Sequence, residues 1–448
     1  MNEPFVPANK NVLEKLRYNC YYAVFKKICS EIKTMQETPQ AIQTHTLANG
    51  LVILGCPMQN VQSVAFGFMA PAGAAVIRRG CCGAANIISD WIFRGADGKS
   101  SRQISDKLDS MGLHRVTRVA GSHITLGAAL QAGNLQAALE LYAGIIHKPT
   151  LDTEQFTLAK QSAIDDVKAL DDDPRQKVML EVREQFYPEP LGRSTTGRLE
   201  ELEKLTAEQV RGIYTDNFNL SKTIFSVAGN YDFELVCTTL KKLLDETSRN
   251  PEKEPRTGRR KEKYRHIKTD GAQVHIGLAT GTVTPSDPDY YEARIAISAL
   301  SGGMSSRLFT EVREKRGLCY AVGARYDGLK QAGGVICYAG TTPEKAQETA
   351  DVVMAEFSRL KDGITQKELE RAAIGLKSSL IMQNESSSHR AGQIAGDYYL
   401  LNRVRSVEDI KQRIEKVTTE SVADFLQGQN FEDFTIVTIG PKQLTVET

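Results

Sequence analysis

Apolar residues recur along this chain with two different periods, which predict strands and helices in alternation. Residues 64–68 and 274–278 alternate apolar side chains on every second position, as a strand with one buried face does. Residues 135–146 and 346–357 instead repeat apolar side chains every three or four positions, which is typical of an amphipathic helix. Each half of the chain therefore runs strands, helix, strands, helices, and this order predicts an α+β fold with mainly antiparallel strands.

The two halves also repeat one another at an offset of about 212 residues. Three pairs of segments show the repeat: the helix N-caps at 152–155 and 365–368, the similar hexapeptides 205–210 and 417–422, and the β-branched runs ending in glycine at 223–229 and 435–440. An Asn49-Gly50 pair before another apolar run predicts a type I′ hairpin at the start of the first half. We therefore expect two similar α+β domains related by internal duplication, each a mainly antiparallel sheet flanked by helices.

Changes in composition predict where the domains begin and end. Residues 1–40 form a helical extension without a counterpart in the second half, and its apolar face packs either on the chain itself or on a partner; that face consists of Tyr21, Val24, Phe25, Ile28, Ile32 and Met35. Residues 249–268 hold nine Lys or Arg, three Glu and two Pro, so they have little to bury. The predicted domains are thus 41–246 and 269–448, joined by a basic linker at 247–268.

Charge and cysteine usage exclude several functional classes. The 56 Lys and Arg nearly balance the 55 Asp and Glu over 448 residues, so no net field favours nucleic acid or an acidic membrane surface. No apolar run approaches the roughly 18 residues of a membrane span, and the N-terminus lacks a secretory or mitochondrial targeting pattern. The eight cysteines form no C-x-x-C pair, and Cys81-Cys82 is interpreted as packing. Together these features predict a cytoplasmic protein.

The most distinctive sequence lies in the second half, at 301–309 (SGGMSSRLF) and 313–322 (REKRGLCYAV). Here the chain resembles the M16 family of zinc metallopeptidases, which includes the mitochondrial processing peptidase subunits, the core proteins of the bc1 complex and insulin-degrading enzyme. The resemblance extends over roughly residues 43–440. It implies two similar α+β domains, in agreement with the internal repeat.

Active members of that family carry H-x-x-E-H on a helix of the first domain, where two histidines one turn apart bind zinc and the glutamate activates water. A third ligand, a glutamate, lies on a later helix. Aligning Gly83 and the segment 93–95 on the family places Asn86 and Asp90 at the histidine positions and Ser89 at the glutamate. Asp166 takes the position of the third ligand. The resemblance therefore implies that the zinc motif is lost here and that no cofactor is bound.

The degenerate positions leave two interpretations. Asn86, Asp90 and Asp166 are oxygen donors that suit Mg²⁺ or Ca²⁺ better than Zn²⁺, but Ser89 does not activate water as a base. The alternative is a polar patch in which these side chains bond to one another or to water. No two histidines of the chain are spaced i, i+4, and the chain has no G-x-S-x-G, P-loop or dinucleotide motif.

The substrate-holding residues of the family are present. An Arg and a Tyr in its second domain hold the peptide and stabilise the oxyanion, and Arg313 and Tyr320 match them; a guanidinium and a phenol both donate to a carbonyl oxygen that gains charge. The alternative is that Arg313 forms an ion pair on a helix and Tyr320 packs in a strand. The family also adds substrate to an edge strand, which corresponds here to residues 111–119, where the usual Asn-Ala-x-Thr wording is absent.

These features predict a noncatalytic subunit that pairs with an active, zinc-bearing M16 homologue and contributes Arg313 and Tyr320 to peptide hydrolysis. A peptide would be the substrate, and a homodimer is the alternative assembly. Two other functions stay open: a self-sufficient metalloendopeptidase with an atypical metal site, and a structural or peptide-binding subunit like the core proteins.

Overall fold

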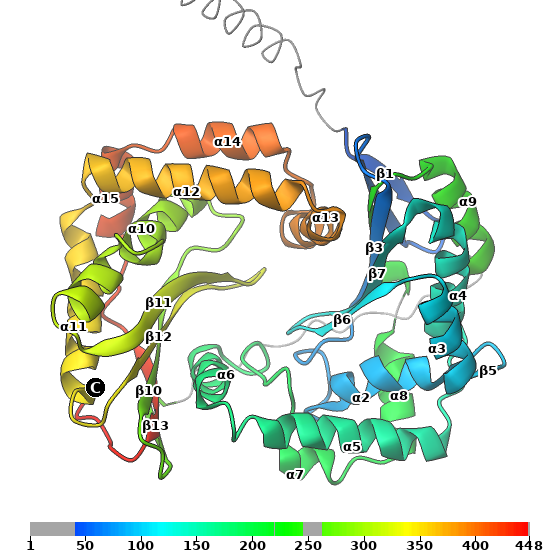
Figure 1. The fold of residues 1–448 in the computed structure, drawn as a ribbon, viewed down its shortest axis with the longest axis horizontal. Helices are drawn as coiled ribbons and strands as arrows, with labels where there is room; N and C mark the ends of the chain where they lie inside the picture. Colours follow the sequence, from blue (N-terminus) through cyan, green and yellow to red (C-terminus); the bar gives the residue numbers. More distant parts are fainter. Residues whose placement is uncertain (1–40, 219, 245–261, 447–448) are drawn as a thin grey trace, which may run out of the picture. The chain divides into compact units, whose positions relative to one another are not determined.

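The first half of the chain builds a six-stranded sheet with helices around it (Figure 1). The structure is a computed structural model that describes residues 41–218, 220–244 and 262–446. The strands lie in the order β1-β2-β8-β3-β7-β6, with β4 and β5 as a separate ribbon. Their bounds are β1 (Gln43–Thr46), β2 (Val52–Pro57), β3 (Ser63–Ala70), β4 (Gly95–Ala96), β5 (Lys99–Ser100), β6 (His114–Val119), β7 (Ile124–Gln131) and β8 (Ile224–Gly229). The helices are α2 (Ala84–Trp91), α3 (Ser101–Ser110), α4 (Leu135–His147), α5 (Thr153–Ala169), α6 (Pro174–Phe186), α7 (Leu199–Leu202), α8 (Ala207–Asn217) and α9 (Phe233–Leu244), with short turns η1 (Ile92–Arg94), η2 (Ala132–Asn134) and η3 (Leu220–Lys222).

The second half builds a five-stranded sheet in the order β11-β12-β10-β13-β9. Its strands are β9 (Tyr264–Lys268), β10 (Val274–Thr282), β11 (Cys319–Gly328), β12 (Gly333–Thr341) and β13 (Thr435–Gly440). Its helices are α10 (Tyr290–Ser301), α11 (Ala346–Ser358), α12 (Gln366–Asn384), α13 (Ser387–Leu401), α14 (Val407–Glu415) and α15 (Thr419–Gln427), with a π-helix η4 (Phe309–Glu314) and a 3-10 turn η5 (Arg359–Asp362). We call the two sheets with the helices of their own half the first and second lobes.

The two sheets have the same topology, which confirms the predicted α+β fold and its duplication. The order β2-β8-β3-β7-β6 in the first lobe corresponds strand for strand to β9-β13-β10-β12-β11 in the second. In both, one pair is parallel, β2 with β8 and β9 with β13, and the other neighbours are antiparallel. Strand β1 is an addition at the β2 edge.

Capping residues begin the matching helices of both lobes at the repeated positions. Thr206 and Thr418 each cap a helix with a reciprocal box, in which the side chain of the third helical residue bonds back to the cap. Asp152 caps α5 and Thr365 caps α12 through their side-chain oxygens. The repeated sequence positions therefore mark the points where matching helices begin, and each helix start depends on a few neighbouring residues.

Each half lends one helix to the sheet of the other half. Helix α6 packs on β10, β12 and β13 of the second lobe, and α13 packs on β2, β3 and β8 of the first (Figure 1). Val178 and Val182 of α6 are fully buried against the second sheet, while Ile394 and Ala395 of α13 are buried against the first. This exchange makes residues 41–448 one compact unit.

Polar contacts accompany this exchange of helices. Arg183 of α6 forms an ion pair with Asp327 of β11, and the Tyr187 hydroxyl donates to the Asp327 carbonyl at 2.8 Å. On α13, the buried guanidinium of Arg390 donates to the Cys56 sulfur of β2 at 3.1 Å. The lobes are therefore joined by directional contacts as well as apolar packing.

Two sequence predictions need correction. The end of the predicted linker is strand β9, because Tyr264 and Ile267 have apolar surface to bury against the second sheet and its covering helix. The turn at Asn49-Gly50 does join β1 to β2, but only Gly50 has a positive φ, of 98°, so the turn is not type I′. Asn49 is instead held by a hydrogen bond from its amide to the Leu244 carbonyl at 2.7 Å.

The predicted extension at 1–40 and most of the predicted linker lie outside the described residues. No helix in the described part of the chain combines the length and the apolar character that a membrane crossing needs.

Candidate functional site

Helix α2, which carries the degenerate motif, begins at a tight contact with α7. Gly83 precedes the helix with φ of +103°, and a Cβ there would lie 2.5 Å from a methyl carbon of Leu202. The backbone N–H of Cys82 donates to the Glu201 carboxylate at 2.7 Å. The start of α2 is therefore fixed by glycine geometry and by one carboxylate.

The side chains at the positions aligned with the family's histidine ligands make contacts within the chain. The Asn86 amide donates to the carbonyls of Thr195 and Thr196, both at 2.7 Å. Asp90 forms an ion pair with Arg94 one turn later at 2.8 Å. Asn86 thus directs its amide N–H groups, not its oxygen, at the loop that contains Thr195 and Thr196, and the charge of Asp90 is balanced by Arg94.

The remaining positions of the motif also lack the chemistry of a zinc peptidase. Ser89 is 8% exposed and donates to the Asn86 carbonyl at 2.8 Å. Asp166 is exposed on α5, and its side chain makes no hydrogen bond or ion pair within the described residues. Ala159, where the family usually keeps another acidic residue, is buried. These donors do not fit a zinc ion, which prefers imidazole and thiolate ligands.

No group of three or more His, Cys, Asp or Glu side chains that could hold a metal ion occurs in the described ranges. The two helices that carry the degenerate positions are adjacent, since α2 packs on α5 and Trp91 contacts Phe156 at a centroid distance of 5.0 Å.

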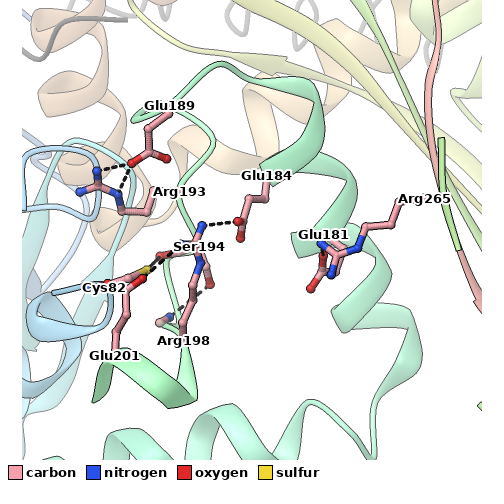
Figure 2. Close-up of polar contacts among 10 residues, drawn as sticks. Cys82, Glu181, Glu184, Glu189, Arg193, Ser194, Arg198, Glu201 and Arg265 are labelled. Carbon is pink, nitrogen blue, oxygen red and sulfur yellow. Dashed lines mark hydrogen bonds and ion pairs between the residues drawn. The ribbon is translucent and has the colours of Figure 1, made fainter. Parts of the chain in front are cut away.

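A charged network that the sequence did not reveal surrounds the start of α2 (Figure 2). Arg198 pairs with both Glu184 of α6 and Glu201, and Arg193 pairs with Glu189. A pocket of about 310 Å³ lies here, lined by Arg79, Gly80, Glu189, Arg193, Arg198 and Glu201. Two of these pairs are local, since Glu189 lies four residues before Arg193 and Glu201 three residues after Arg198, whereas Glu184 lies 14 residues from Arg198.

Cys82 in this network is not a nucleophile. Burial raises the pKa of its thiol to about 12, despite the nearby Arg198 guanidinium, which acts in the opposite direction. The thiol donates weakly to the Ser194 carbonyl at 3.5 Å (Figure 2). Cys82 is therefore protonated at neutral pH and serves packing and weak hydrogen bonding.

Arg313 and Tyr320 lie together at the surface of the second lobe. The π-helix η4 carries Arg313 and β11 begins next to it, so the guanidinium carbon stands 5.3 Å from the centre of the Tyr320 ring and 4.8 Å from that of Phe309. Tyr320 is 83% exposed. The side chains of Arg313 and Tyr320 make no hydrogen bond or ion pair with another described residue, so the guanidinium and the phenol are both free to donate.

The strand that corresponds to the family's substrate strand is β6. It lies at the edge of the first sheet, paired only with β7, and its side chains are exposed except for Val119, which is half-buried. Arg115 of this strand lies over the Phe93 ring, 4.8 Å from its centre. The outer backbone groups of β6 therefore remain open to an added strand.

Fold and candidate site together define a two-lobed protein of the peptidase type. A family profile described as "Insulinase (Peptidase family M16)" matches residues 58–198, and one described as "Peptidase M16 inactive domain" matches residues 204–376. The chain belongs to the M16 family.

Similar proteins cover nearly the whole chain. A protein of Rickettsia bellii named an uncharacterized zinc protease is 26% identical over 89% of this chain and 97% of its own length. A crystal structure of a peptidase M16 inactive domain from Pseudomonas fluorescens aligns with a TM-score of 0.81 and 22% identity, covering 91% of this chain and 99% of that one. A chain of complex III from Candida albicans aligns with a TM-score of 0.78 and 18% identity, covering 90% and 96%. These structures share the fold.

Proposed function

We propose that this chain is a noncatalytic M16 subunit that pairs with an active, zinc-bearing homologue and supplies Arg313 and Tyr320 to the peptide substrate. The observation that carries the proposal is a contrast between the two lobes. Asn86 and Asp90 in the first lobe are held by Thr195, Thr196 and Arg94, whereas the donors of the second lobe are exposed.

The chemistry of the exposed pair agrees with a role at a scissile peptide bond. A guanidinium and a phenol both donate to a carbonyl oxygen that becomes an oxyanion in the transition state. The cation–π contact between Arg313 and Tyr320 orients the guanidinium before substrate arrives. A subunit with these donors needs a second chain to provide the metal-bound water.

The first lobe offers no route to hydrolysis by itself. The Ser89 hydroxyl is engaged with the Asn86 carbonyl, and a serine hydroxyl has no pKa suited to activating water. Aspartate positions 90 and 166 together supply too few ligands for a zinc site with an open position.

Reconstitution tests the proposal. The chain, a histidine-bearing M16 homologue of the same organism, and their mixture are assayed on a quenched fluorescent peptide. We expect the mixture to cleave faster than the homologue alone, and Arg313→Gln to lower kcat by about 10²–10³-fold, as loss of one oxyanion donor does. Tyr320→Phe removes only the hydroxyl and tests the second donor.

Arg371→Gln is the matched control, because Arg371 is an exposed arginine of α12 in the same lobe and takes no part in the contact between Arg313 and Tyr320. If Arg313→Gln and Arg371→Gln mixtures have the same kcat, the assignment of Arg313 is wrong. If the mixture is no faster than the homologue alone, the pairing itself is wrong.

Two other functions are alternatives. The likeness to a complex III chain favours a structural subunit. A peptide could still add to the open edge of β6 in such a subunit. Arg313→Gln would then leave the assembly of the subunit with its partners unchanged. A self-sufficient metalloendopeptidase would require the chain alone to cleave peptides and Asp166→Ala to abolish cleavage. A homodimer in place of the heterodimer, and the cytoplasm as compartment, remain predictions.

A further inference from the structure

A second pocket lies inside the second lobe, away from the degenerate motif and from the Arg313–Tyr320 pair. Four helices form it, α10, α12, α13 and α14 (Figure 1), together with the segment that joins the last two. Its volume is about 150 Å³, well above the roughly 10–15 Å³ that one water molecule needs. It is lined by Tyr290, Tyr291, Arg294, Leu376, Ser379, Leu380, Gln383, Gln393, Arg405, Ile410 and Ile414.

The lining contains two guanidinium groups and no carboxylate. Arg405 is neutralised by Asp397, which lies behind the lining, through bonds of 2.6 and 3.1 Å. Arg294 differs, because its hydrogen bond is to the neutral Tyr290 hydroxyl at 2.7 Å and it makes no ion pair with a described carboxylate. The pocket therefore has an excess of positive charge that comes from Arg294.

The Arg294 guanidinium is held in place. Its carbon lies 5.7 Å from the centre of the Tyr290 ring and 5.9 Å from that of Tyr326. Tyr326 is itself anchored by a hydrogen bond from its hydroxyl to the Val283 carbonyl at 2.9 Å. A guanidinium has five N–H donors, so most of those of Arg294 are left for water or a ligand.

Other polar groups of the lining can also donate. The Gln393 side-chain oxygen accepts from Arg390 at 3.0 Å, which leaves the Gln393 amide N–H groups as donors. The Tyr291 hydroxyl accepts from Arg405 at 3.3 Å, and burial raises its pKa, so the phenol keeps a proton to donate. A ligand rich in acceptors satisfies these groups.

The rest of the wall is aliphatic. Leu376 and Leu380 of α12 and Ile410 and Ile414 of α14 supply it. An inorganic oxyanion gains nothing from such a wall, whereas the carbon chain of a small organic acid buries apolar surface there.

We propose that this pocket binds a short aliphatic carboxylate, with the carboxylate paired to Arg294 and the carbon chain against the leucines and isoleucines of α12 and α14. Because the ligand contacts residues from four helices, its binding stabilises the lobe. The proposal is independent of the pairing with a homologue and of the degenerate motif.

The test uses the full chain with two probes, n-butyrate and inorganic phosphate, in calorimetric titration and thermal unfolding. We expect saturable butyrate binding with a rise in Tm, and little response to phosphate. Arg294→Gln should weaken butyrate binding by about 10–100-fold, as loss of a charge-assisted hydrogen bond does. Arg294→Lys keeps the charge but not the planar fork, so it should bind with intermediate affinity.

Arg371→Gln again serves as the control for charge, since Arg371 lies on α12 outside the lining; it should bind butyrate like the unaltered chain. Phosphate binding in place of butyrate would overturn the carboxylate assignment. The site would be overturned if neither probe bound to the unaltered chain. It would also be overturned if the folded Arg294→Lys and Arg294→Gln variants bound butyrate with the same affinity as the unaltered chain.

Discussion

Introducing the family's zinc ligands into this chain would show whether its backbone still has the geometry of a zinc site and only the side chains differ. The variant carries Asn86→His, Ser89→Glu, Asp90→His and Asp166→Glu. Because α2 and α5 still pack on each other, we expect the restored side chains to bind one zinc ion.

The magnitude follows from the contacts that the variant loses. The Asn86 amide makes two hydrogen bonds of 2.7 Å, each with a net value of about 0.5–1.5 kcal/mol. The partly exposed ion pair of Asp90 with Arg94 adds up to about 1 kcal/mol. The zinc-free variant should therefore lose about 1–4 kcal/mol of unfolding free energy, and zinc at 100 times its Kd should return about 2.7 kcal/mol.

Urea unfolding with and without zinc measures both quantities, and Asn86→His alone is the control. The single variant should lose about 1–3 kcal/mol and regain little with zinc, because one histidine with two carboxylates is a poor zinc site. A folded fourfold variant that zinc does not stabilise would refute the reasoning, since the backbone itself would then have left the geometry of the site.

Three further predictions concern stability. The pKa of Glu368 is lowered to about 2, because its bonds with Arg307 and the Thr365 backbone outweigh the opposing effect of burial. The contribution of this carboxylate to the free energy of unfolding is complete above the ordinary pKa of 4.5 and is lost as pH falls toward 2. The stability of Glu368→Gln, measured by unfolding at a series of acid pH values, should therefore depend less on pH over that range. Asp327→Asn weakens the half-buried pair with Arg183 and should cost about 1–3 kcal/mol in urea unfolding. Val182→Ala should cost about 2–3 kcal/mol, and a cost near zero would contradict the burial of α6 on the second sheet.

Much of the fold is encoded locally and was therefore predictable. The caps Thr206 and Thr418 and the alternating strand at 64–68 each depend on a few neighbouring residues. The exchange of α6 and α13 was not predictable, because a helical period shows that a face is buried but not against which sheet. Ala65 illustrates this: it is on the face that alternation assigns to solvent, yet α13 covers it.

The site was predictable only in part. The resemblance predicts the degenerate motif and the Arg313–Tyr320 pair as site residues, and the structure shows that a π-helix and the start of one strand bring Arg313 and Tyr320 into contact. It did not reveal the partners of Asn86, because the accepting carbonyls lie more than a hundred residues away. Nor did it reveal the pocket around Arg294, whose lining comes from four helices.

The absence of a working metal centre is tested most directly by elemental analysis of the purified chain. The protein is incubated with a modest excess of zinc, passed over a gel-filtration column, and analysed for bound metal, with peptide cleavage measured on the same sample. A noncatalytic subunit retains almost no zinc and cleaves nothing alone. The account would be contradicted by about one zinc per chain together with peptide cleavage that Asp166→Ala abolishes. That result would identify an active peptidase with unconventional zinc ligands.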